Sequence, residues 1–353
     1  MAKVAGAEAA VSTWSMLRLL LPISLVGVGA VLAAVTAAQI LPHGVLRYID
    51  VPAESLPLSE AALPVAPELV APAVELAMLT SPELPGSSGP PIEVDSSLLE
   101  TTAVGLVPRI GTDGRTSLRH YARPALSTCI RPCVGIVVTG LGLAAGPSTR
   151  ALNSPAAVGL SFSPYADAAD WQARARQSGH EALLDLPLQP VAYPQDDSGP
   201  LTVRITEPPP VEEGLLTVLA TGQGYVAVTG EAGEFAANPA AFAPIARILH
   251  ARGLGFIELA GAALGPTALA EGLPFVEAGG PVDVAGQDGD HSFEMVEAEA
   301  RRMGRVLAFV QPTPVGLDRL DAWLSTLPAK GLQVVPPSIL LDEARRQHTI
   351  AGP

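Results

Sequence analysis

Carboxylates stand at or just after several apolar, strand-like runs in the C-terminal part of the chain. Asp185, Glu231 and Glu258 each follow such a run, and Asp283 comes later. Oxygen ligands at neighbouring strand ends could bind a hard cation such as magnesium or calcium. The same groups could serve as general acid and base. The alternative reading is that each carboxylate caps a following helix or faces water.

The remaining strand ends carry weaker chemistry. The first run ends on Thr139 and Gly140, neither of which is an acid, a base or a metal ligand. The second run ends near Tyr165 and a late one ends on Gln311. Zinc prefers histidine or cysteine ligands, and no histidine occupies a strand end. The histidines are His43, His120, His180, His250, His291 and His348.

These strand ends belong to a regular alternation over residues 132–340. Strand-like runs cover 134–138, 158–162, 182–186, 225–228, 254–259, 306–310 and 332–335, and helical patterns cover 167–178, 211–221, 239–252, 293–303 and 316–327. Such alternation predicts a mainly parallel sheet with right-handed crossovers. About seven units fit either a barrel or an open doubly wound sheet, and ligands of both folds bind at the carboxyl ends of the strands.

The N-terminal part of the chain has the pattern of a membrane anchor. Residues 19–41 contain no charge and reach about 34 Å as a helix, enough to cross a bilayer core. Lys3 and Arg18 precede this segment, so residues 1–18 are predicted to be cytoplasmic and the rest extracytoplasmic. This predicts a single-pass protein of the inner membrane with a periplasmic C-terminal domain. A cleaved signal peptide with a site near Ala37 is the alternative.

Residues 42–131 are predicted to be a linker rich in proline, alanine and acidic residues. No Lys or Arg occurs between Arg47 and Arg109, and proline recurs throughout 50–108. Proline interrupts helices and ladders while like charges repel, which favours a disordered spacer. The globular domain is then expected at 132–345, with a short tail at 346–353.

Charge and cysteine content limit the partners. The net charge of -14 argues against nucleic acid, because no basic surface would neutralise phosphates. Cys129 and Cys133 are the two cysteines of the chain. They could close a small disulfide or stay as thiols, and a single pair does not make a zinc site.

Three stretches of the domain resemble a known family. They are GHEALLDLPLQP at 179–190 with the following Tyr193-Pro194, DSGPLT at 197–202, and SFSPYA at 161–166. Together they resemble the divergent polysaccharide deacetylase family over about residues 132–340. The resemblance implies a distorted (β/α) barrel of about seven strands. It also implies a divalent metal, usually zinc, that activates water against an acetyl group of a glycan.

The residues that this resemblance implies for catalysis are largely absent. Paired aspartates are implied where the chain has Thr139 and Gly140. A histidine is implied at a position best matched by Glu231, and another at Gln311. An implied aspartate corresponds to Glu258. The combined loss of the acids and histidines predicts a degenerate site.

A further implied glutamate has become Gln189, so the candidate cleft residues are Tyr165, Asp185, Gln189, Glu231, Glu258 and Asp283. We expect a membrane-anchored domain that binds a glycan or an envelope protein, without a cofactor and without hydrolysis. The alternative is an active hydrolase that removes acetyl groups from an envelope polysaccharide, with a metal held by rearranged carboxylates. A scaffold that interacts through its proline-rich segment is the third hypothesis.

Overall fold

The computed structural model describes residues 93–124, 129–130, 132–205, 209–260, 263–284 and 289–351. The predicted segments 1–18 and 19–41 and the first half of the predicted linker lie outside the described residues. No helix within the described part is long and apolar enough to cross a membrane.

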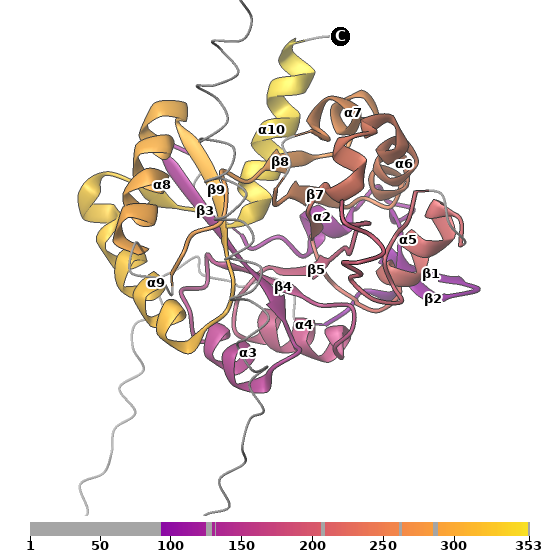
Figure 1. Cartoon of the computed structure of the whole chain (residues 1–353), viewed down its shortest axis with the longest axis horizontal. Helices are drawn as coiled ribbons and strands as arrows, with labels where there is room; N and C mark the ends of the chain where they lie inside the picture. The colour runs from indigo at the N-terminus through magenta and orange to yellow at the C-terminus, as the bar shows by residue number, and fades with distance from the viewer. Residues whose placement is uncertain are drawn as a thin grey trace, which may run out of the picture. The chain divides into compact units, whose positions relative to one another are not determined.

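Seven parallel strands form a nearly closed barrel (Figure 1). In their order around the barrel they are β3 (Cys133–Leu141), β4 (Gly159–Phe162), β5 (Ala182–Asp185), β6 (Ala227–Gly230), β7 (Gly255–Glu258), β8 (Phe275–Glu277) and β9 (Arg305–Val310). β9 pairs along its whole length with β3. Six of these strands match the predicted runs, and all are parallel as predicted.

Backbone contacts after β8 close the barrel. The Gly279 amide donates to the Leu307 carbonyl at 2.7 Å, and the Val282 amide donates to Phe309 at 2.9 Å. The two elements therefore meet through irregular chain rather than through a regular ladder. Of the two folds that the sequence allowed, the structure therefore has the distorted barrel and not the open doubly wound sheet.

The seventh predicted strand was misplaced. Residues 332–335 give only β10 (Gln333–Val334), which pairs with the first two residues of β3. The seventh barrel strand is β8, which has three residues and precedes a glycine pair. A strand this short presents too few residues for hydrophobic periodicity to reveal it.

Helices cover the outside of the barrel, because each crossover buries its apolar face on the sheet. The α-helices are α3 (Ala145–Ala151), α4 (Ala168–Gln177), α5 (Val211–Leu219), α6 (Ala243–Ala251), α7 (Gly265–Ala270), α8 (Gly289–Met303) and α9 (Pro314–Thr326). Short 3-10 helices are η2 (Gly233–Ala236), η3 (Pro239–Phe242) and η4 (Pro328–Lys330). The five predicted helical patterns all fall on these elements.

Helix α10 (Pro337–Ala351) packs against the amino-terminal ends of the strands. A Cβ on Gly135 would lie 2.6 Å from Leu340 Cδ1, and a Cβ on Gly159 would lie 2.5 Å from Pro337 Cγ. Glycine in these strands therefore makes room for the helix. The predicted tail at 346–353 is wrong up to residue 351, since no Pro or Gly interrupts the helix before Gly352.

The linker prediction is wrong for residues 93–124, which we call the strap. The strap contains η1 (Ser96–Leu98), a hairpin of β1 (Leu99–Thr102) and β2 (Gly105–Pro108), and α2 (Ser117–His120). Its side chains Leu98, Val107, Leu118 and Tyr121 are buried. Burial of these apolar side chains stabilises the strap against the barrel, despite the prolines nearby.

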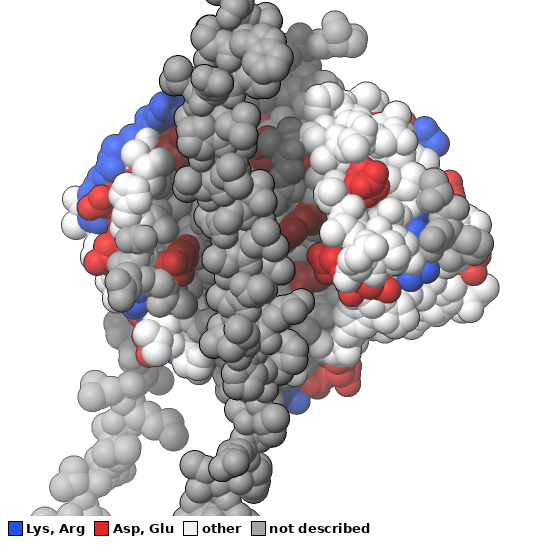
Figure 2. Space-filling view, viewed as in Figure 1, with Lys and Arg blue, Asp and Glu red and all other residues white. Residues whose placement is uncertain are grey.

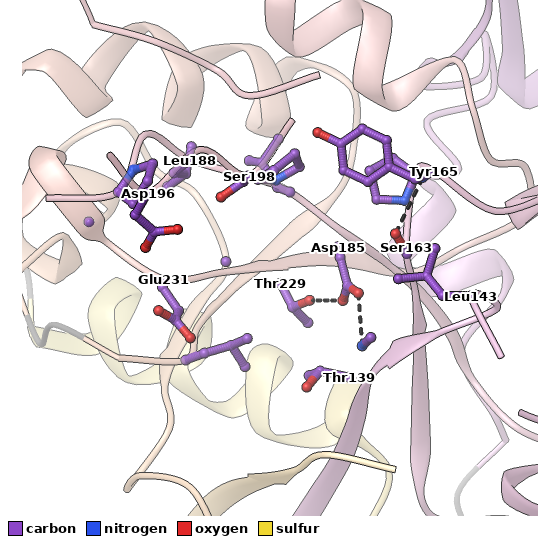
Figure 3. Close-up of a pocket in the computed structure, with 18 residues that line it drawn as sticks. Thr139, Leu143, Ser163, Tyr165, Asp185, Leu188, Asp196, Ser198, Thr229 and Glu231 are labelled. Atoms are coloured by element: carbon purple, nitrogen blue, oxygen red, sulfur yellow. Dashed lines mark hydrogen bonds between the residues drawn. The ribbon is translucent and has the colours of Figure 1, made fainter. Parts of the chain in front are cut away.

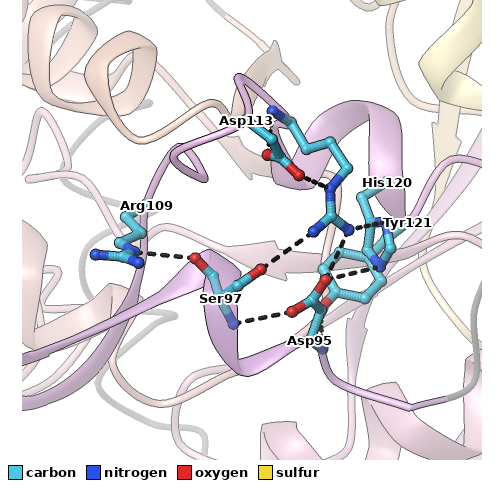
Figure 4. A network of polar contacts seen from close by, with 7 residues as sticks. Asp95, Ser97, Arg109, Asp113, His120 and Tyr121 are labelled. Carbon is cyan, nitrogen blue, oxygen red and sulfur yellow. Dashed lines mark hydrogen bonds and ion pairs between the residues drawn. The ribbon is translucent and has the colours of Figure 1, made fainter.

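Polar contacts hold the strap in shape (Figure 4). The Arg115 guanidinium donates to Asp95 at 2.7 Å and to Asp113 at 2.5 Å. The Tyr121 hydroxyl accepts a hydrogen bond from the Asp95 amide at 2.8 Å. Hydrogen bonds from the side chain and the backbone amide of Ser97, followed by those from Arg115, hold the pKa of Asp95 at about 2, below its ordinary value. Asp95 and Asp113 are therefore paired with a cation rather than left to repel each other.

Cys129 and Cys133 form a disulfide at the start of β3. The sequence left open whether they are bridged or free. The bridge ties the chain that follows the strap to the first barrel strand.

Candidate functional site

A cavity of about 400 Å³ opens at the carboxyl ends of β3 to β7. Parallel α/β folds place their ligands at this end. Its polar lining residues are Thr139, Ser163, Tyr165, Asp185, Asp196, Ser198, Thr229 and Glu231. Glycine, proline and leucine residues complete the wall. Figure 2 shows acidic side chains in the hollowed middle of this face of the molecule, whereas basic side chains stand mainly near its outer edges.

Asp185, the last residue of β5, lies at the centre of this pocket (Figure 3). Its Oδ1 accepts hydrogen bonds from the Ser161 hydroxyl at 2.5 Å and the Thr229 hydroxyl at 2.8 Å. Its Oδ2 accepts one from the Gly140 amide at 2.9 Å. Burial raises the pKa of Asp185, and the three donors oppose that rise. Both oxygens of this carboxylate are therefore engaged by the protein.

Glycine at position 140 allows the first strand to reach Asp185. Gly140 has φ 70°, in the left-handed region that glycine tolerates best. The strand end that lacks an acid thus contributes a backbone donor instead.

Ser161 and Thr229 form a buried polar layer with Asp185. Their side chains are 0% and 1% exposed, and their hydroxyl oxygens lie 2.8 Å apart. Ser161 does not line the cavity, and both hydroxyls already donate to the Asp185 carboxylate. Their types were visible in the sequence, but their inward direction became clear only with the strand register.

Two further carboxylates face the pocket. Glu231 follows β6, and Asp196 lies in the loop after β5. Both are exposed, and neither has a side-chain hydrogen bond or ion pair to another described residue. Sequence reasoning named Glu231 but missed Asp196, which immediately precedes the DSGPLT stretch that carried the family resemblance.

Tyr165 forms one wall of the pocket. Its hydroxyl accepts a hydrogen bond from the Leu201 amide at 3.1 Å, and burial raises its pKa. A Cβ on Gly199 would lie 2.8 Å from the Tyr165 hydroxyl, so glycine lets the loop close over the ring. The ring stays 39% exposed, which leaves it available to a ligand.

Ser163 is a lining residue that the sequence reasoning did not select. Its side chain is 5% exposed, and its hydroxyl accepts a hydrogen bond from the Tyr165 amide at 3.3 Å. Thr139 lines the same wall, and its hydroxyl lies 3.5 Å from the Val310 carbonyl. Both residues lie at the ends of strands that the sequence predicted.

Glu258 does not line the pocket. Its carboxylate accepts hydrogen bonds from the Ala263 amide at 3.0 Å and the Leu264 amide at 3.3 Å, at the start of α7. Burial raises its pKa. The capping alternative therefore describes Glu258, because its carboxylate accepts hydrogen bonds from the two amides that immediately precede α7.

Three other expected residues also lie outside the lining. The Gln189 amide oxygen accepts a hydrogen bond from the Ile205 amide at 3.1 Å and so braces the loop after β5. Asp283 is exposed beyond the chain that closes the barrel, and Gln311 is exposed after β9. The pocket is built on one side of the barrel mouth, so the ends of β8 and β9 do not contribute the expected side chains.

The Gly-His-Glu stretch lies at the opposite end of the barrel. The ring nitrogens of His180 lie 2.9 Å from the Val158 carbonyl oxygen and 3.2 Å from that of Leu152. Its side chain is buried, and burial lowers its pKa. Its contacts hold the chain around the start of β4 and β5, as its position before the third strand predicted.

The lining residues do not fit the zinc site that the resemblance implied. The described residues contain no group of three His, Cys, Asp or Glu side chains arranged to hold a metal ion. No histidine contributes to the described lining, and both oxygens of Asp185 already accept protein hydrogen bonds. The rearranged site of four carboxylates is not assembled among the described residues either, since neither Glu258 nor Asp283 lines the pocket.

Comparisons place these observations among known proteins. The family model described as divergent polysaccharide deacetylase matches residues 136–341. The crystal structure of an uncharacterized protein from Agrobacterium tumefaciens C58 is similar, with a TM-score of 0.62 and 30% identity over 67% of this chain and 99% of that one. A putative cellobiose-phosphate cleavage protein from Enterococcus faecalis V583 matches with a TM-score of 0.37 and 7% identity, over 57% of this chain and 96% of that one. The second likeness is too low to bear on function, and no curated protein matches the chain.

Proposed function

The chain belongs to the divergent polysaccharide deacetylase family, and from this premise we propose that its barrel binds a glycan without hydrolysing it. The protein is thus carbohydrate-related and deacetylase-like. Its mode of action, in this proposal, is recognition at the barrel mouth. Fold alone does not assign the function, so the proposal depends on the residues of the pocket.

The observation that carries the proposal is the state of Asp185. A carboxylate that binds a metal or takes a proton from water needs an unoccupied acceptor site directed at it. Hydrogen bonds from Gly140, Ser161 and Thr229 occupy three of the about four acceptor sites of the Asp185 carboxylate, and the described residues contain no group of three side chains arranged to hold a metal beside it. This argues for a carboxylate that holds three strand ends together beneath a binding surface.

The cavity itself suits a small part of a glycan. Its volume of about 400 Å³ lies within the usual range of ligand pockets. Hydroxyl and carboxylate groups can pair with sugar hydroxyls, while the exposed ring of Tyr165 offers a flat apolar wall. An envelope protein that presents similar groups is the other partner that this surface could recognise.

We further propose that the domain works outside the cytoplasm, behind an anchor at residues 19–41. The uncharged length of that segment and the basic residues before it support this orientation. The Cys129–Cys133 disulfide supports it as well, because disulfides persist in oxidising compartments.

Acetate release and sugar binding, measured on the full chain, test the proposal. N-acetylglucosamine oligomers are incubated with the protein and with zinc, manganese, magnesium or calcium, and acetate is quantified. Glycan oligomers are titrated separately by calorimetry. We expect no acetate release above the protein-free rate, and binding that weakens in Tyr165→Ala.

Metal-dependent acetate release that disappears in Glu231→Gln would refute the loss of hydrolysis. Glu258→Gln is the matched control, because it removes the same charge from a carboxylate outside the pocket. Failure of every glycan to bind would refute the binding role and would favour a protein partner.

A further inference from the structure

We infer that the pocket selects an amino sugar whose amino group is free and protonated, in preference to its N-acetylated form. The inference rests on the proposed glycan binding and names the ligand class of that site. The expected ligand is a stretch of glycan that has already lost its acetyl groups. A reaction that removes acetyl groups must therefore supply it.

The charge of the pocket gives the first argument. Its described lining contains Asp185, Asp196 and Glu231, and no Lys, Arg or His. Asp185 is engaged by three donors, but Asp196 and Glu231 have no donor or cation among the described residues. Figure 3 shows these two side chains on the side of the pocket away from Tyr165. Acidic groups in a concave site concentrate negative potential, which favours a cationic ligand.

Ser163 gives a second, independent argument. This side chain is 5% exposed and lines the cavity. Its oxygen accepts a hydrogen bond from the Tyr165 amide, while its own proton has no acceptor in the described part of the chain. Because a buried donor without a partner is unfavourable, a ligand oxygen is the expected partner. The ligand should therefore carry an acceptor oxygen, such as that of a sugar hydroxyl, as well as a positive charge.

The arrangement suits an organic cation better than a metal ion. The carboxylates do not converge into a group that could hold a metal. They are distributed around a cavity of about 400 Å³, which has room for a sugar ring. Tyr165 can pack on the ring while the opposite side receives the amino group.

The free amine and the acetamide differ in what they offer two unpaired carboxylates. An ammonium group presents three donors and a full positive charge. An acetamide presents one N–H donor, and its carbonyl oxygen is a further acceptor that Asp196 and Glu231 would repel. Charge-assisted hydrogen bonds are also about twice as strong as neutral ones. The pocket should therefore discriminate through this one group.

The test is calorimetric titration of the full chain near pH 6 and at about 0.15 M salt, where surface attraction is screened. The probes are a glucosamine trisaccharide, the N-acetylglucosamine trisaccharide and trilysine. We expect the glucosamine trisaccharide to bind at least about 10-fold more tightly than the other two.

Variants locate the effect in the pocket. Glu231→Gln and Asp196→Asn should each lower the affinity for the glucosamine trisaccharide about 3- to 10-fold. Glu234→Gln removes the same charge three residues along the chain, from a side chain that does not line the pocket, and should leave the affinity unchanged.

The outcomes separate this inference from the function on which it rests. Equal or tighter binding of the N-acetylated trisaccharide would overturn the inference and leave glycan binding standing. Trilysine binding as tightly as the glucosamine trisaccharide would also overturn it, since the pocket would then attract any cation and would not recognise the sugar. If no sugar binds, the proposed function fails and the inference fails with it.

Discussion

Glu181 joins three parts of the structure at the base of the barrel, so its titration should be visible in the stability. Its carboxylate accepts hydrogen bonds from the Arg123 amide at 2.8 Å, from the Ser338 amide at 2.9 Å and from the Ser338 hydroxyl. These contacts tie the strap and α10 to the start of β5. Burial raises the pKa of Glu181 from its ordinary value of 4.5 to about 7.

The size and sign of the effect follow from this shift. A rise from 4.5 to about 7 corresponds to about 3 kcal/mol, at about 1.4 kcal/mol for each pH unit. The folded chain holds the proton more tightly than the unfolded chain does. This contribution is therefore complete below about pH 4.5, falls as the pH rises toward 7, and is lost above that.

The variant Glu181→Gln cannot titrate at this position. Its side chain offers one acceptor oxygen where Glu181 serves two backbone amides, and a lost hydrogen bond costs about 1 kcal/mol. We expect the variant to be less stable than the wild type near pH 4.5 and more stable above pH 7. The two stability curves should therefore cross.

Urea unfolding of the full chain at several pH values measures both curves. Glu212→Gln, at an exposed position on α5, corrects for the loss of one carboxylate. Parallel curves for the wild type and Glu181→Gln would refute the reasoning, because Glu181 would then not carry the proton that stabilises the fold.

Two further predictions test the packing of the base and the role of a cap. Gly159→Ala should lower the free energy of unfolding by about 1–3 kcal/mol, because its Cβ would lie 2.5 Å from the rigid ring of Pro337. Gly146→Ala has no heavy atom within 4 Å and should be neutral or slightly stabilising, so equal losses in urea unfolding would contradict this account. Near pH 4.5, Glu258→Gln should lower stability by about 1 kcal/mol by weakening the hydrogen bond from the Leu264 amide, without changing sugar affinity in calorimetry. Loss of sugar binding in Glu258→Gln would contradict this account, because Glu258 would then contribute to the binding site.

Part of the site could be found from the strand ends alone. The sequence predicted that Tyr165, Asp185 and Glu231 follow strands, and all three line the pocket. Glu258 also follows a strand, yet it turns toward α7. Sequence position places a side chain at the correct end of the barrel but does not fix its direction, because direction depends on the loop that follows.

Asp196 and Ser163 are lining residues that the sequence did not predict. Asp196 lies in an irregular loop, where no periodicity relates sequence position to location. Ser163 follows β4, and its residue type alone does not show that its side chain lines the cavity. The strap could not be predicted for a related reason. Its prolines and acidic residues have the composition of a spacer, and its fold depends on the burial of its apolar side chains against the barrel.

The sequence by itself determined the parallel α/β class, the order of most elements and the absence of the implied acids and histidines. These are properties of residue type and local periodicity, which need no knowledge of distant contacts. Only the tertiary structure decided that the sheet closes, that the strap is folded and that Asp185 is held by Gly140, Ser161 and Thr229. Each of these depends on groups far apart in the chain, whose meeting is set by strand register and packing.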